Sequence, residues 1–165
     1  MLPPFLDGAE LLALRPKGGG ERDAAVLILL HRTECGLSFP LIERTEGMRH
    51  HPGQIALPGG GLEPGEKALV AAVRETQEEL GVAVAATSLR LSLSPIFAHP
   101  SNYWVYPFVA CVESLNDYKL NGGEAKSFFE VPLSALMDSS SRSTFPLNRA
   151  GKTWDVPCFR FDEKI

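Results

Sequence analysis

The feature that most constrains this chain is a glycine- and proline-rich segment followed directly by a single strong helix. Between residues 53 and 65 the sequence includes PGGGLEPG, which favours loop structure. Apolar residues then recur at helical spacing from residue 67 to residue 80, and Gly81 supplies a stop signal. At about 100° per residue, one helix face is apolar and is expected to be buried. That face carries Leu69, Ala72, Val73, Thr76 and Leu80.

A second face of this helix crowds three carboxylates, Glu75, Glu78 and Glu79, around one cation, Arg74. Like charges at i,i+3 and i,i+4 destabilise a helix by roughly 0.2–0.5 kcal/mol per pair. A solvated acidic face is the plain interpretation of such a cluster on its own. The preceding loop favours another, because its exposed backbone carbonyls and the carboxylates are hard oxygen ligands. Such donors suit Mg²⁺ or Mn²⁺, which also bind substrate phosphates.

Composition limits the classes of partner. The 165 residues fit one domain, with 44% hydrophobic and 22% charged residues. A net charge of −4 argues against a general nucleic-acid or membrane-surface binder. The three cysteines are far apart and lack ligand spacing, which favours reduced thiols. No signal peptide or membrane span is expected, so the sequence predicts a cytoplasmic protein.

Strand patterns surround the helix. We expect a buried strand at Ala24–Leu30 with a partner at Ser38–Glu43, and later strands at 89–95, 103–112, 126–131 and 153–161. Short helices are expected at 8–15 and 132–137, and a short strand is possible at 54–57. The polar run at 138–143 leaves open whether that segment is ordered. Mixed strands around one helix indicate an α/β layered sandwich.

The run from Gly60 to Val82 resembles the Nudix box, the signature of the Nudix hydrolases. In that box a glycine precedes a glutamate by six positions, and an Arg-Glu pair and a Glu-Glu pair follow at fixed spacing. This chain supplies Gly60, Glu66, Arg74, Glu75, Glu78, Glu79, Gly81 and Val82 at those places. Thr76 stands where an aliphatic residue is usual.

This resemblance implies a fold and a reaction. The fold is an α/β/α sandwich with a mixed sheet, formed here by a single domain over 1–165 with 1–23 as an N-terminal extension. Members hydrolyse a nucleoside diphosphate linked to another group, using divalent cations. By position, Glu75 and Glu79 resemble the principal metal ligands, with Glu78 a further one and the Gly59 carbonyl a backbone ligand. Arg74 and Glu66 are expected to form an ion pair that orients the helix.

Upstream, residues Leu41–Gly60 resemble the signature of the coenzyme A diphosphatase subfamily. The matching residues are Leu41, Arg44, Arg49, Gly53, Pro58, Gly59 and Gly60, with Thr45 and Leu57 as departures. Coenzyme A carries a 3′-phosphate besides its diphosphate, so cations are expected near the metal loop. Arg44, Arg49 and His51 are the candidates for these phosphates, and a solvated turn is the alternative for Arg49 and the histidines.

Glu124, in a loop-like NGGEAKSF segment, is a further candidate metal ligand or general base, although an exposed acid there can equally be only solvated. The subfamily continues into a C-terminal helix, whereas this chain ends at FRFDEKI, so we expect that helix to be missing. The leading expectation is hydrolysis of coenzyme A or a derivative by a monomer or homodimer. Alternatives are the same chemistry on ADP-ribose, NADH or another nucleotide derivative, or a Nudix-fold binding module without turnover.

Overall fold

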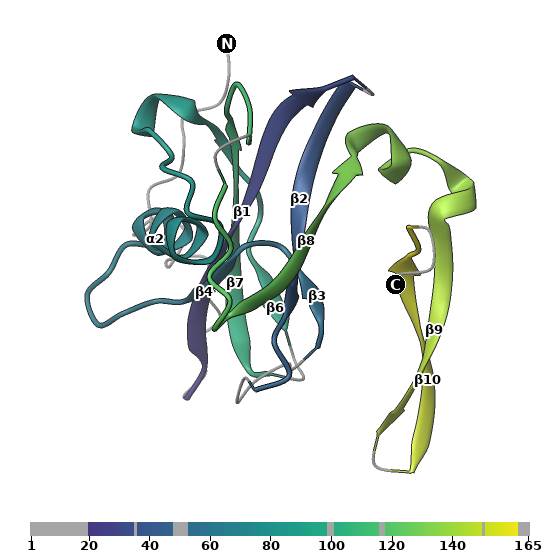
Figure 1. Ribbon diagram of the computed structural model, residues 1–165. Helices are drawn as coiled ribbons and strands as arrows, with labels where there is room; N and C mark the ends of the chain where they lie inside the picture. The colour runs from purple at the N-terminus through teal and green to yellow at the C-terminus, as the bar shows by residue number, and fades with distance from the viewer. Residues whose placement is uncertain are drawn as a thin grey trace.

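A mixed β-sheet with one helix packed on it forms the body of the protein (Figure 1). The computed structural model describes residues 20–34, 36–47, 53–98, 101–115, 118–149 and 151–161. The eight strands of the main sheet are β1 (Arg22–Thr33), β2 (Gly36–Arg44), β3 (Ile55–Ala56), β4 (Gly59–Gly61), β5 (Leu89–Ser92), β6 (Ile96–Ala98), β7 (Tyr103–Cys111) and β8 (Ala125–Pro132). A separate hairpin joins β9 (Arg142–Arg149) to β10 (Lys152–Phe159). Helix α2 spans Ala68–Leu80, and short 3₁₀ turns lie at Ala86–Ser88, Leu133–Leu136 and Ser139–Ser141.

Strand β1 is the centre of the sheet. The strand order is β3-β2-β1-β7-β5, and β4, β6 and β8 pair with β1, β7 and β2 respectively. The β1–β7 pair is parallel and the other pairs are antiparallel, so the sheet is mixed as expected. Alternate residues Ala25, Leu27 and Leu29 on β1 are fully buried in the core, on the side of the sheet that carries α2.

Helix α2 is rotated relative to the predicted face. Thr76 and Leu80 are buried as expected, but Leu69 and Val73 are only half-buried. In their place Ala71 and Glu79 are buried, so the buried face is turned toward the carboxylates. Small alanines at 68, 71 and 72 let the helix lie close to the sheet there. The prediction that Glu79 lies on a face away from the core was therefore wrong.

The ends of α2 follow the sequence signals. Gly81 has φ of 69°, a left-handed conformation suited to glycine, and its N–H donates to the Gln77 carbonyl. The buried Thr76 hydroxyl donates to the Ala72 carbonyl at 2.7 Å. This bond satisfies the polar atom that Thr76 brings to a position where the motif that the sequence resembles usually has an aliphatic residue.

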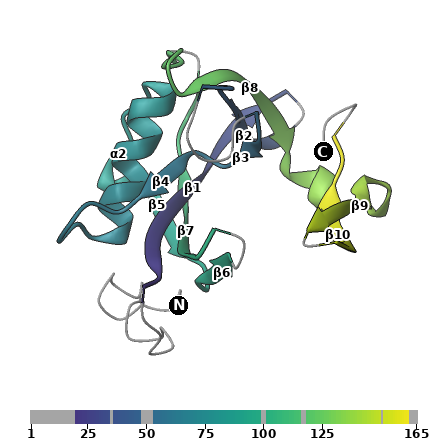
Figure 2. The ribbon, with the colours of Figure 1, turned by 90° about the horizontal axis from the view of Figure 1, so that it is seen from below.

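The two faces of the sheet are covered differently. Helix α2 lies on one side and the β9–β10 hairpin beside the other, as the view from below shows (Figure 2). On the hairpin side, a cavity of about 360 Å³ is lined by apolar side chains that include Ile28, Phe129 and Phe159. The α/β class and the mixed sheet are confirmed. Within the described residues α2 is the only α-helix, so these residues form no second helical layer on the other face of the sheet.

Most other elements match the sequence expectations within a few residues. Strands β4, β6 and β9 were not predicted, because they are short or lack a clear alternation. The polar run at 138–143 is ordered, since Asp138 accepts a hydrogen bond from the Ser140 amide before β9 begins. The helix expected at 8–15 lies outside the described residues. None of the helices in the described part is long and apolar enough to cross a membrane.

Candidate active site

Glu79 is a buried carboxylate of the acidic cluster and is held from two sides, by β4 and by the end of β2. Its side chain is only 2% exposed. The Gly59 amide on β4 donates to Oε2 at 2.9 Å, and Arg44 Nη1 at the end of β2 lies 3.3 Å from Oε1. Both carboxylate oxygens therefore have a donor, and one glutamate joins the helix to two strand ends.

Burial dominates the electrostatic state of Glu79. Burial raises the pKa of Glu79 to about 7, and repulsion from Glu75 and Glu124 adds to the rise. The Gly59 hydrogen bond and the Arg44 charge lower this pKa but do not offset burial. A cation at this cluster would stabilise the ionised carboxylate.

Glu75 lies one helical turn before Glu79 and packs against Gly60 of β4. A Cβ on Gly60 would lie 2.4–2.6 Å from the Glu75 carboxylate atoms, so only glycine leaves room for this carboxylate. Arg74 Nη1 donates to Glu75 Oε1 at 2.9 Å. Burial nevertheless raises the pKa of Glu75. Gly60 thus sets where the Glu75 carboxylate can lie, which the sequence did not reveal.

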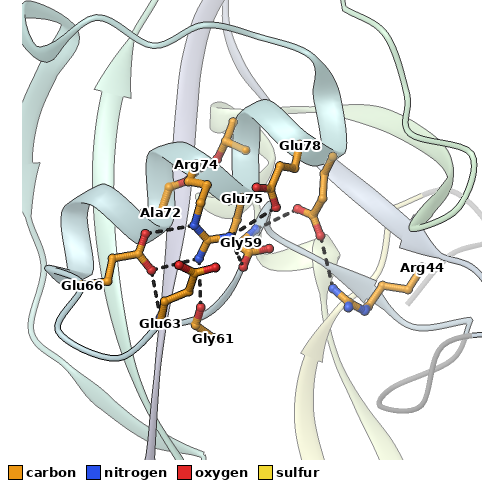
Figure 3. Close-up of polar contacts among 11 residues, drawn as sticks. Arg44, Gly59, Gly61, Glu63, Glu66, Ala72, Arg74, Glu75 and Glu78 are labelled. Atoms are coloured by element: carbon orange, nitrogen blue, oxygen red, sulfur yellow. Dashed lines mark hydrogen bonds and ion pairs between the residues drawn. The ribbon is translucent and has the colours of Figure 1, made fainter.

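Arg74 organises the loop before the helix. Its Nε and Nη2 donate to the two oxygens of Glu66, each at 2.9 Å, so the predicted ion pair is present and bidentate (Figure 3). Nη2 also donates to the Gly61 carbonyl at 3.2 Å. The hydrogen bond with Arg74 is the main cause of a lowered pKa at Glu66. The pair joins the loop around Glu66 to the helix that carries the carboxylates.

Glu78 and Glu124 complete the acidic group. Glu78 is 46% exposed and contacts Arg74 Nη1 at 3.2 Å, as its spacing predicts. The Glu124 carbonyl accepts a hydrogen bond from the Thr45 amide, and the Asn121 amide donates to the Glu79 carbonyl. This loop therefore joins the end of α2 to the end of β2. Repulsion from Glu124 makes a minor contribution to the raised pKa values of Glu75 and Glu79, so its charge acts on both carboxylates.

The three predicted phosphate-binding residues have different outcomes. Arg49 and His51 lie outside the described residues, so their roles stay predictions. Arg44 is described and contacts Glu79, a contact that no sequence signal indicated. The pairing of β2 with β8 is irregular between Glu43 and Arg44. Such irregularities re-aim side chains at strand ends, and Arg44 lies at one.

The donor set fits a hard divalent cation. Glu75, Glu78 and Glu79 offer carboxylate oxygens on one side of α2, and β4 passes beside them at Gly59. In the described part of the chain the side chains do not already converge as a metal cluster, because the carboxylates face Arg74 and Arg44. Burial raises the pKa of Glu75 and of Glu79, and the neighbouring arginines lower these pKa values without offsetting the burial.

Comparison with known proteins agrees with this arrangement. A family model described as the NUDIX domain matches residues 21–147, so the chain belongs to this family. The solved structure of a C. elegans Ap4A hydrolase binary complex has a TM-score of 0.55 at 22% identity, covering 70% of this chain and 83% of that one. At that identity the likeness shows the fold alone.

Two curated relatives share more sequence. A C. elegans protein named peroxisomal coenzyme A diphosphatase ndx-8 is 35% identical over 150 residues, which is 89% of this chain and 63% of that protein. An uncharacterized Nudix hydrolase NudL from Citrobacter koseri is 35% identical over 161 residues, covering 94% of this chain and 81% of that protein. The chain therefore spans less than two thirds of the C. elegans relative.

Proposed function

We propose that this protein hydrolyses the diphosphate bond of coenzyme A, or of a derivative, to 4′-phosphopantetheine and adenosine 3′,5′-bisphosphate. The observation that carries the proposal is the cluster of Glu75, Glu78 and Glu79 beside β4, in which burial raises the pKa of Glu75 and of Glu79. Such a cluster repels a diphosphate unless divalent cations lie between them. Support for coenzyme A in particular comes from the residues at 41–60 and from the name of the C. elegans relative.

Glu75, Glu79, Glu78 and the Gly59 carbonyl would hold Mg²⁺ or Mn²⁺. When bound, the metal supplies charge stabilisation for the diphosphate and lowers the pKa of an attacking water. The protein's own groups then have separate tasks. Arg74 and Glu66 hold the loop against the helix, while the Gly59 amide fixes one oxygen of Glu79. Glu124 is the candidate to take the proton from water, because it is a further carboxylate whose charge acts on Glu75 and Glu79.

Arg49 and His51 are the proposed contacts for the outer phosphates of the substrate. Both belong to the segment that follows Arg44, the last residue of β2, and precedes β3. Arg44 itself lies against the cluster. A guanidinium can grip a phosphate through two parallel hydrogen bonds, and a protonated histidine adds charge. The cytoplasmic location and the monomer or homodimer state expected from the sequence stay predictions.

A substrate panel tests the proposal. Purified protein with Mg²⁺ would be given coenzyme A, ADP-ribose, NADH and dGTP at equal concentration, and products would be separated by chromatography. We expect coenzyme A to have the highest kcat/KM. Preference for ADP-ribose, NADH or dGTP would keep the chemistry and overturn the substrate. Binding without turnover of any compound would indicate a binding module and overturn both.

A further inference from the structure

Among the described residues, two arginines contact the acidic cluster, and they are held very differently. Arg74 is saturated with acceptors: two oxygens of Glu66, the Gly61 carbonyl, and the carboxylates of Glu75 and Glu78. Moving this guanidinium would break all of these contacts together. Arg74 is therefore a fixed part of the site.

Arg44 has a much weaker hold. Among the described residues its guanidinium contacts Glu79, with Nη1 3.3 Å from Oε1, which is long for a charge-assisted hydrogen bond. Its Nε is buried and has no acceptor among the residues that the structure describes. A buried donor without a partner carries an unrecovered desolvation cost. The guanidinium therefore gains by moving to a place that offers more acceptor oxygens.

The backbone at Arg44 lets the side chain move without the strand. The Arg44 amide donates to the Gln54 carbonyl at 3.0 Å, and its carbonyl accepts from the Gly53 amide at 3.2 Å. These two hydrogen bonds join the main chain at Arg44 to the main chain at residues 53 and 54. The side chain is 17% exposed, so it borders solvent while the main chain stays fixed. Only side-chain rotation is required to turn the guanidinium away from Glu79.

We propose that Arg44 is the resident counter-cation of Glu79 and leaves it when a divalent cation binds, its guanidinium then pairing with the substrate's diphosphate. This inference rests on the proposed function, because it takes Glu79 as a metal ligand and a diphosphate as substrate. A guanidinium and a divalent cation on the same carboxylate repel each other. Of the two arginines, Arg44 has fewer hydrogen bonds to lose than Arg74. Phosphate oxygens supply the acceptors that Nε lacks.

Departure of Arg44 from Glu79 on metal binding predicts opposite effects of one substitution on metal binding and on substrate binding. Arg44→Met removes a competing charge, so Mn²⁺ binding to the protein alone should become tighter by about threefold to tenfold. The same variant should have a KM about tenfold higher for whichever nucleoside diphosphate derivative the enzyme hydrolyses, because a charge-assisted contact is lost. A residue that only maintained the fold would weaken both kinds of binding.

The experiment titrates Mn²⁺ into metal-free protein without substrate, following free Mn²⁺ by electron paramagnetic resonance. Arg44→Gln is the second variant in case the methionine variant does not fold. Arg44→Lys should keep the wild-type Mn²⁺ affinity because it keeps the charge. Arg32→Met, at an exposed arginine on β1, is the control and should change neither Mn²⁺ affinity nor KM. Circular dichroism checks that each variant is folded.

Weaker or unchanged Mn²⁺ binding in both charge-removing variants, with normal binding by the wild type, would overturn this inference alone. So would an unchanged KM. No Mn²⁺ binding by the wild-type protein would overturn the proposed metal site and this inference together. Tighter Mn²⁺ binding combined with a raised KM supports the proposal that Arg44 leaves Glu79 for the diphosphate.

Discussion

At the residue scale, the ionisation of Glu79 decides how the site affects stability. The carboxyl has a pKa raised from 4.5 to about 7 because it is buried. A raised pKa means that the folded protein binds this proton more tightly than the unfolded chain does. The favourable contribution is therefore present below about pH 4.5 and is lost as the pH rises toward 7.

This shift gives a measurable pH dependence. In metal-free protein, the loss attributable to Glu79 between about pH 5 and pH 8 should approach roughly 3 kcal/mol in the free energy of unfolding. Glu79→Gln cannot ionise and should lack this part of the loss. Urea unfolding of both proteins at the two pH values, with chelator present, gives the comparison. Parallel pH profiles for wild type and variant would show that Glu79 does not titrate in this way.

The same substitutions separate catalysis from folding. Glu75→Gln and Glu79→Gln keep the side-chain size but remove ligand charge, and we expect kcat to fall by at least about 100-fold. Stability without metal should be equal to or higher than that of the wild type at neutral pH, because ionisation of both carboxylates is unfavourable in the fold. Steady-state kinetics and thermal unfolding measure the two effects. A variant that lost stability but kept its activity would place these carboxylates in structure.

Substrate choice is tested at Arg49. If Arg49 binds the 3′-phosphate, Arg49→Ala should raise KM for coenzyme A about tenfold more than for 3′-dephospho-coenzyme A. The comparison cancels general damage to the loop, since both compounds share the diphosphate and the pantetheine arm. Equal losses on both compounds for Arg49→Ala and for the matching His51→Ala would remove the evidence for 3′-phosphate recognition.

At the scale of elements, the glycine strand β4 and helix α2 must approach closely for the site to form. A Cβ on Gly60 would collide with the flexible end of Glu75, whereas a Cβ on Gly59 would lie 2.2 Å from the backbone carbonyl oxygen of Ala25. The first collision can be relieved by moving the Glu75 side chain. The second needs the β1–β4 pairing to shift.

We therefore expect Gly60→Ala to lower kcat by about 100-fold through displacement of Glu75, with little change in melting temperature. Gly59→Ala should instead lower the melting temperature. Gly122→Ala is the matched control, because nothing lies within 4 Å of its added Cβ. Thermal unfolding and initial rates of all three variants make the comparison. Normal activity in Gly60→Ala would show that Glu75 need not lie where the structure places it.

The elements also show what sequence can and cannot predict. The helix and the long strands carry their own periodicity, and Gly81 marks a boundary by its own chemistry, so these were predicted closely. The rotation of α2 was missed because it depends on alanines packing closely on the sheet, which lets Glu79 be buried against β4 and β2. Contacts between distant segments, such as Arg44 with Glu79, leave no mark on local sequence.

At the scale of the whole molecule, an acidic protein would have to hold the anionic diphosphate that we propose as its substrate. The chain carries a net charge of −4, and the deepest carboxylates already have raised pKa values. The match over residues 21–147 covers both the sheet and the acidic helix, so the site belongs to the domain as a whole. Divalent cations are the simplest means of reconciling these charges.

The most direct measurement is therefore the metal dependence of coenzyme A hydrolysis. Protein freed of metal and kept in chelator should form no product from coenzyme A. Addition of Mg²⁺ or Mn²⁺ in excess of the chelator should restore formation of 4′-phosphopantetheine and adenosine 3′,5′-bisphosphate, separated by chromatography and identified by mass. Full activity in the metal-free preparation would contradict the role assigned to Glu75, Glu78 and Glu79.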